Sequence, residues 1–126
     1  EVQARAEVAA LRAAWPGAEA PPGDPRGHWL PDPADVHVLA AAIDAHCHGI
    51  VTLNAQDFPR DILAGEGLRR LAPDELAMEC LGVDAAATAR VGAAVLATAR
   101  RLSGEDWQMR ALMKKARLPR LGKALA

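Results

Sequence analysis

Aromatic residues are scarce in this chain of 126 residues, which has no tyrosine, one phenylalanine and three tryptophans. Hydrophobic residues still make up 51%, much of it alanine, and this favours closely packed helices over a β-sandwich. Cysteine is sparse too: Cys47 and Cys80 show no disulfide-framework spacing, so we expect a reducing, cytoplasmic setting. No run approaches the ~20 apolar residues of a membrane span, which excludes a membrane-spanning helix. The length suits one hydrophobic core rather than two independent ones.

Charge is unevenly distributed along the chain, although the net charge is only −1. Residues 1–98 hold seven Lys or Arg against fourteen Asp or Glu, a net −7, whereas residues 99–126 hold eight against two, a net +6. We expect the basic segment to attract a polyanion, with Lys114, Lys115 and Arg117 among its contacts. The alternative is a solvated face, or one that pairs with the acidic part of the chain.

The most informative stretch is residues 30–59, LPDPADVHVLAAAIDAHCHGIVTLNAQDFP. Asp32 is placed to cap a helix, Pro33 suits the first helical position, and Asp35 completes a pattern like a capping box. The helix face that follows is apolar, at Val36, Leu39, Ile43 and Cys47. Gly49 is the expected helix terminator, and residues 50–53 are predicted to form a short strand.

This stretch predicts a cluster of polar side chains. A helix of ~14 residues is ~21 Å long, and a strand of about five residues covers ~17 Å on the way back. Asp35 and the loop Asn54–Asp57 should therefore converge at the carboxyl edge of the sheet, where open α/β sheets bind ligands. Carboxylate and amide oxygens there are the ligands that Mg²⁺ or Mn²⁺ takes. In the alternative interpretation, Asp32 and Asp35 are only caps, and Asn54 and Asp57 only shape a turn.

The rest of the chain predicts mainly helices. Residues 2–15 form a helix that Pro16-Gly17 ends, and residues 16–31, with five prolines and three glycines, form an irregular connection. The pattern then predicts a helical turn over 60–64, a strand over 68–71 and a helix over 73–81 that Gly82 ends. A helix over 84–102 follows, and a capping box at 103–106 is expected to start a further helix. A short basic segment comes after Pro119.

Residues 30–59 resemble the C-terminal half of a PIN domain, the fold of VapC-like toxin ribonucleases. The resemblance rests on two blocks at the expected separation, D-P-x-D-x-H-V-L-A-A-A and I-V-T-x-N-x-x-D-F-P. It implies an α/β, mostly helical fold with three α/β/α layers and short parallel strands. It also implies a partial PIN-like core over residues 1–83 and a helical extension with a basic tail over residues 84–126.

The function that the resemblance implies is a metal-dependent endoribonuclease, the toxin of a toxin–antitoxin pair. Asp35, Asn54 and Asp57 match catalytic and metal-binding positions for Mg²⁺ or Mn²⁺, and Asp32 matches either a cap or an outer ligand. Thr52 matches a residue whose hydroxyl orients the loop. The implied partners are an RNA substrate and an antitoxin protein, with no membrane.

Histidine offers two further interpretations. His37 is expected near the acidic edge, in contact with Asp57 or a phosphate, or else simply exposed. A zinc site built from His37, His46, His48 and the two cysteines is disfavoured, because their spacing fits no standard finger.

The chain departs from the PIN pattern at its start. A complete PIN domain begins with a strand ending in Asp and a helix carrying a second acid, and both would precede Glu1. We therefore expect this chain alone to lack about half of the metal ligands and to be inactive. The remainder would come from a separate chain, a swapped neighbour or a longer precursor, and the open strand edge would favour a homo-oligomer. The alternative function is a non-catalytic PIN-like module that binds protein or RNA.

Overall fold

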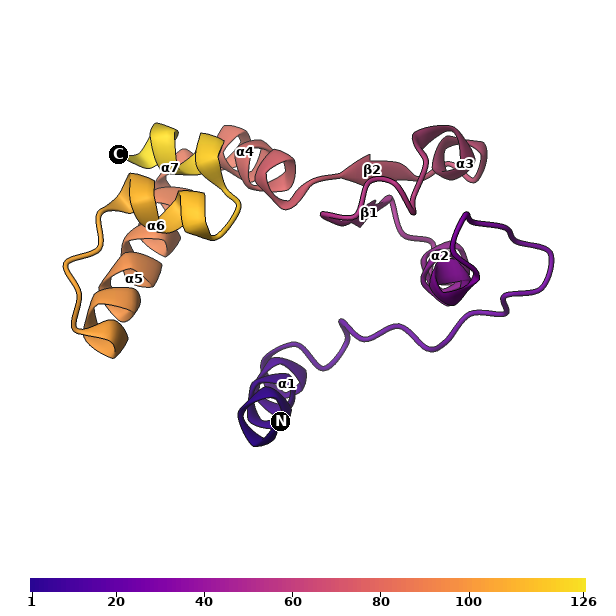
Figure 1. Cartoon of the computed structure of the whole chain (residues 1–126), viewed down its shortest axis with the longest axis horizontal. Helices are drawn as coiled ribbons and strands as arrows, with labels where there is room; N and C mark the ends of the chain where they lie inside the picture. The colour runs from indigo at the N-terminus through magenta and orange to yellow at the C-terminus, as the bar shows by residue number, and fades with distance from the viewer. The chain divides into compact units, whose positions relative to one another are not determined.

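The computed structural model describes residues 1–126 as a mostly helical α/β chain, which confirms the predicted fold class at that level (Figure 1). Two short strands pair in parallel as the whole sheet. The elements in chain order are α1 (Val2–Ala14), the 3₁₀ helix η1 (Pro33–Asp35), α2 (Val36–Asp44), β1 (Gly49–Val51), α3 (Arg60–Gly65), β2 (Arg69–Leu71), α4 (Pro73–Val83), α5 (Ala85–Ser103), α6 (Met109–Lys115) and α7 (Pro119–Leu125).

The chain divides into two compact units. The first unit comprises residues 1–50 and 54–70, and the second comprises residues 51–53 and 71–126. Within the second unit α4 packs with α5 and α7. These contacts group α4, which the resemblance assigned to the partial PIN-like core, with the helices that follow it. No helix of the chain combines the length and apolarity needed to cross a membrane.

The core of the first unit is built around α2. Its apolar residues recur every three or four positions, so one face of the helix is buried, including Val36 and Leu39. Leu30 from the preceding connection, together with Ile50, Phe58, Leu63 and Leu68, completes the cluster. Cys47, expected on the same face, lies beyond the end of the helix and is exposed.

The irregular connection of residues 16–31 packs closely on α2 through Gly23. A Cβ atom at Gly23 would collide with the backbone of Ala40 and Ala41, so only glycine fits there. The Asp24 backbone N–H donates to Asp44 Oδ2 at 3.3 Å. A segment without regular structure is thus held against the helix that forms the core.

The prediction that Gly49 ends the helix was wrong. α2 ends at Asp44, and His46 takes the left-handed conformation, with φ 55°, in the turn that follows. Gly49 belongs to β1, where a Cβ would lie 2.7 Å from the Arg69 carbonyl oxygen of β2. Glycine is required here for the close approach of the two strands.

Two further helix ends differ from expectation. Gly82 lies inside α4, which continues to Val83. The expected capping box at 103–106 does not start a helix: Gly104, with φ 70°, ends α5, and α6 begins only at Met109. The Ser103 hydroxyl instead donates to the Ala99 carbonyl at 2.7 Å. The glycine ends α5 because it adopts the left-handed conformation without steric cost.

α1 forms as predicted but buries none of its residues. Val8, Leu11 and Trp15 of its apolar stripe are 44%, 57% and 61% exposed. Arg12 donates two hydrogen bonds to Glu19, at 2.7 and 2.9 Å, and this lowers the pKa of the Glu19 carboxyl. Both side chains are well exposed, so the pair contributes little to stability.

Asp74, which is buried at the start of α4, links two helices of the second unit. Its two carboxylate oxygens accept hydrogen bonds from the backbone N–H groups of Arg120 and Leu121, at 2.9 and 3.1 Å. These donors lie in the first turn of α7, where a carboxylate is favoured by unpaired N–H groups and by the helix dipole. Asp74 therefore joins α4 to α7 across 46 residues of sequence.

We predict that Asp74→Ala destabilises the protein by about 2–4 kcal/mol, because it leaves one buried and one part-buried backbone N–H group without their charged acceptor. Asp74→Asn, which keeps one acceptor oxygen, should lose about half as much. Urea denaturation measures both, with Asp61→Asn as the control at an exposed acid on α3. Equal stability of Asp74→Ala and the parent chain would contradict this role.

Candidate functional site

Three carboxylates meet in the first unit. Asp32, Asp35 and Asp57 each offer one oxygen atom, and the three atoms lie within 4.8 Å of one another. Asp32 and Asp35 come from the beginning of the η1–α2 helical segment, and Asp57 comes from the loop after β1. The predicted convergence of the helix start and this loop is confirmed.

Helix capping accounts for Asp32 but not for Asp35. The Asp32 Oδ1 atom accepts a hydrogen bond from the Ala34 backbone N–H at 2.9 Å, with Pro33 at the first helical position. Asp35 stands where η1 passes into α2, and its side chain makes no capping hydrogen bond. The expected capping box is therefore not formed, and the Asp35 carboxylate remains available at the beginning of α2.

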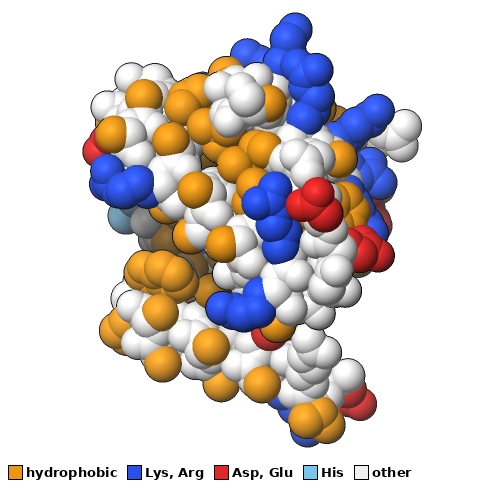
Figure 2. Space-filling model, turned by 90° about the vertical axis from the view of Figure 1, so that its left-hand side faces the viewer, with side chains coloured by type: hydrophobic (Ala, Val, Ile, Leu, Met, Phe, Trp, Pro, Cys, Tyr) orange, Lys and Arg blue, Asp and Glu red, His pale blue; other side chains and the backbone are white.

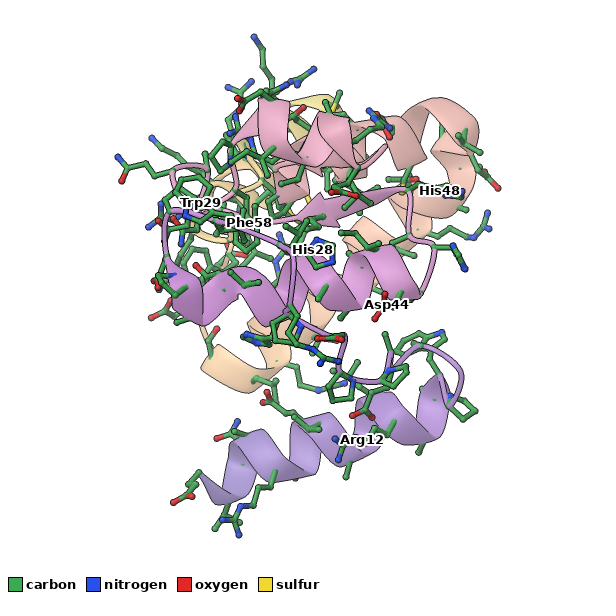
Figure 3. All side chains as sticks on the ribbon, turned by 90° about the vertical axis from the view of Figure 1, so that its right-hand side faces the viewer. Arg12, His28, Trp29, Asp44, His48 and Phe58 are labelled. Carbon is green, nitrogen blue, oxygen red and sulfur yellow. The ribbon has the colours of Figure 1, made fainter.

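The loop after β1 presents Asp57 through two contacts. Asn54 Nδ2 donates to Asp57 Oδ2 at 2.6 Å, which orients the carboxylate. The next residue, Phe58, is buried in the core of the first unit. Asp44 is the last residue of α2, and Figure 3 shows Phe58 near Trp29 at the other end of the helix, where α2 begins. Burial of Phe58 thus brings Asp57 to Asp32 and Asp35.

Arg70 is a site residue that the sequence prediction missed. This half-buried side chain extends from β2, and its guanidinium donates to the carbonyl oxygens of Ala55, at 3.1 Å, and Phe58, at 3.3 Å. It therefore fixes the backbone on both sides of Asp57. The sequence placed Arg70 on the strand predicted over residues 68–71. Nothing in the sequence pattern indicated that its side chain reaches the loop around Asp57.

The cluster carries uncompensated negative charge. All three carboxylates are partly exposed, and none of them pairs with Lys or Arg. Ionised carboxylates this close repel one another, and a cation bound between them would relieve the repulsion. The three are also the only group of His, Cys, Asp and Glu side chains near enough to share a metal ion.

The remaining predicted site residues lie elsewhere. His37 is exposed on the first turn of α2, and the expected contact with Asp57 is not formed. The Thr52 backbone N–H donates to the Leu71 carbonyl at 2.9 Å, which extends the strand pairing; the role of its hydroxyl stays a prediction. In the second unit, Lys115 lies over the Trp107 ring, with Nζ 5.2 Å from its centroid. Lys114 and Arg117, at and beyond the end of α6, are exposed.

The cysteine and histidine side chains form no zinc cluster. Cys47 and Cys80 are both free and exposed. Comparison with protein-family models, curated proteins and solved structures found no match to this chain. The acidic cluster is therefore the feature of this chain that points to a function.

We predict that Arg70→Met loosens the loop that carries Asp57, because two carbonyl groups lose their donor at a cost of about 1 kcal/mol each. Amide hydrogen exchange of residues 55–58 should be faster in this variant. The control is Arg60→Met, at an exposed arginine on α3 that makes no side-chain hydrogen bond. If both variants exchange like the parent chain, Arg70 does not support the loop.

Proposed function

We propose that the acidic cluster binds a divalent cation, Mg²⁺ or Mn²⁺, in a PIN-like endoribonuclease of three-layer α/β/α architecture. The convergence of Asp32, Asp35 and Asp57 without a cationic partner is the observation that carries this proposal. When bound, the cation would activate water and stabilise the negative charge that develops on the phosphodiester.

The residues fit such an ion in both chemistry and spacing. Carboxylate oxygens are the preferred ligands of Mg²⁺, and at ~2.1 Å per bond two ligands on opposite sides are ~4.2 Å apart. Adjacent ligands of the same ion are ~3.0 Å apart, so separations of up to 4.8 Å require the side chains to approach by less than about 2 Å. Small changes of carboxylate torsion are sufficient for this.

Each residue of the cluster has a distinct role in this proposal. Asp35 and Asp57 hold the cation, and Asp32, which also caps η1, adds a third oxygen. Asn54, expected from the sequence as a ligand, orients Asp57 by its hydrogen bond. Arg70 keeps the backbone around Asp57 in place.

The proposed partners follow from the resemblance to VapC-like toxins. They are an RNA substrate, drawn by the basic residues that include Lys114, Lys115 and Arg117, and an antitoxin protein. A two-stranded parallel sheet leaves open edges, which favours pairing with a further strand, from a second copy or from a segment that supplies the remaining acids. The two free cysteines suit a reducing, cytoplasmic setting.

We expect one Mn²⁺ ion to bind the chain, and Asp57→Asn to weaken that binding by about tenfold or more, because one charged ligand is removed. Electron paramagnetic resonance of free Mn²⁺ measures the affinity. The matched control is Asp61→Asn, which removes an exposed carboxylate on α3 outside the cluster. Equal Mn²⁺ affinity of all three proteins would remove the basis of the proposed cation site.

The enzymatic part requires a separate test. We predict that the longest product of the reading frame containing this chain cleaves RNA with Mn²⁺, and that Asp35→Asn and Asp57→Asn each reduce the rate by about 100-fold or more with folding intact. Gel analysis of a mixed-sequence RNA measures cleavage. A cation site without any RNA cleavage would contradict the nuclease function and leave the cation proposal standing.

The second candidate is a non-catalytic PIN-like interaction module. It is favoured by the exposure of large apolar side chains in the second unit, such as Val91 and Leu102, which are 64% and 77% exposed. This candidate predicts no dependence of binding on Mn²⁺. It also predicts that Asp57→Asn leaves partner affinity unchanged.

A further inference from the structure

The longest helix of the second unit exposes an apolar face. Val91, Val95 and Leu102 of α5 recur at helical spacing, and they are 64%, 47% and 77% exposed. An amphipathic helix normally buries this face against a neighbour. A contiguous exposed apolar surface of this kind marks a site of interaction with another molecule.

Three neighbouring hollows make this face into a groove. The first, of about 460 Å³, lies among α4, α5, α6 and α7, and the others, of about 430 and 490 Å³, follow along α5. The first two share Val91 and Val95, and the last two share Ala99. From Ala87 to Leu102 the groove follows α5 for ~22 Å, the length of about four helical turns.

The helices that form the groove are strongly basic. Within their bounds α5, α6 and α7 carry eight Lys or Arg and no Asp or Glu. The fourth helix, α4, borders only the first hollow, through Ala77 and Cys80, and carries the acids Asp74, Glu75 and Glu79. Figure 2 faces the side of the second unit with these helices and shows hydrophobic side chains between Lys and Arg side chains. Lys115 lines the groove beside Trp107, and Glu105, at the same end, is the acidic side chain that lines it.

The positions on α5 place arginines beside the apolar face. Arg90 and Arg101 are each one residue before Val91 and Leu102, and eleven residues apart, so they form an adjoining strip on the helix. Arg100 is occupied, since it donates to the Trp107 carbonyl at 2.8 Å and lies 3.7 Å from Asp106. Arg90, Arg101 and Lys115 make no ion pair within the chain.

We propose that this groove binds an acidic amphipathic helix of another protein. The apolar side chains of that helix would enter the groove at i, i+3, i+4 and i+7 spacing. Its Asp or Glu residues, on the flanks, would pair with Arg90, Arg101 and Lys115. The proposal does not depend on the acidic cluster or on RNA cleavage.

Charge and chemistry favour this occupant over two others. A nucleic acid would place charged phosphates over Val91, Val95 and Leu102, and only one aromatic ring, Trp107, is at hand for base stacking. A second copy could offer its exposed α1. That helix carries Arg5 and Arg12 and only one acid, Glu7, so it supplies no acidic flank.

Synthetic peptides test the proposal on the full chain. One helical peptide of about 18 residues carries leucines at i, i+3, i+4 and i+7 with glutamates on both flanks, and a matched peptide carries lysines instead. Fluorescence anisotropy should show the glutamate peptide binding at least about tenfold more tightly, with a preference that high salt reduces. Equal affinity for the two peptides would overturn the proposal.

Substitutions then locate the binding surface. Val95→Glu, at an exposed position in the groove, should weaken glutamate-peptide binding by about tenfold or more. Ala89→Glu introduces the same charge at an exposed position on another face of α5, with no Lys or Arg three or four residues away, and should not alter the binding. The double variant Arg101→Glu and Lys115→Glu reverses two charges and should bind the lysine peptide more tightly than the glutamate peptide. This measurement tests the surface even if Val95→Glu does not fold.

Two other outcomes would assign the groove to a different occupant and overturn the proposal. One is tighter binding of a poly(U) oligonucleotide than of the glutamate peptide, with that RNA binding lost in Val95→Glu. The other is a dimer by light scattering that Val95→Glu dissociates, which would make a second copy the occupant.

Discussion

Burial of Phe58 in the core formed by Leu30 and Leu39 is the contact on which the candidate site depends. The adjacent residue, Asp57, can reach Asp32 and Asp35 only because this aromatic side chain fixes the loop after β1 at the beginning of α2. Every other contact at the site refines that placement. The hydrogen bond from Asn54 orients the carboxylate, and Arg70 holds the backbone carbonyls on either side. Phe58 therefore fixes the loop in the core, and its neighbour in the sequence, Asp57, provides the carboxylate of the site.

The two units present surfaces of opposite chemistry. The first unit brings together three carboxylates that pair with no Lys or Arg side chain. A bound metal ion would reduce the repulsion between them. The second unit exposes an apolar groove along α5, and the charged residues of α5, α6 and α7 are all basic. Asp74 keeps this groove together, because it joins the start of α4 to the first turn of α7. The exposed stripe of α1 is a further apolar surface without a covering neighbour.

Local signals in the sequence predicted most of the helices and both strands. The cap at Asp32 followed from the Asp-Pro start signal of the helix. The convergence of Asp35 with Asp57 followed from helix and strand geometry, which is nearly independent of tertiary packing. Helix ends were predicted less well. Gly49 and Gly82 lie within elements because a glycine serves close packing as readily as it ends a helix, and only tertiary contacts distinguish the two uses. Arg70 and Asp74 were missed for a related reason: their hydrogen-bond partners lie 12 to 47 residues away.

We propose that Asp32, Asp35 and Asp57 together hold one divalent cation. Paramagnetic broadening by Mn²⁺ in a ¹H–¹⁵N correlation spectrum tests it directly, because the effect falls steeply with distance from the ion. Substoichiometric Mn²⁺ should broaden the amide signals of residues 32–35 and 54–58 first, and excess Mg²⁺ should restore them. Broadening spread over exposed acids such as Asp61 and Glu66, with no preference for the cluster, would contradict it.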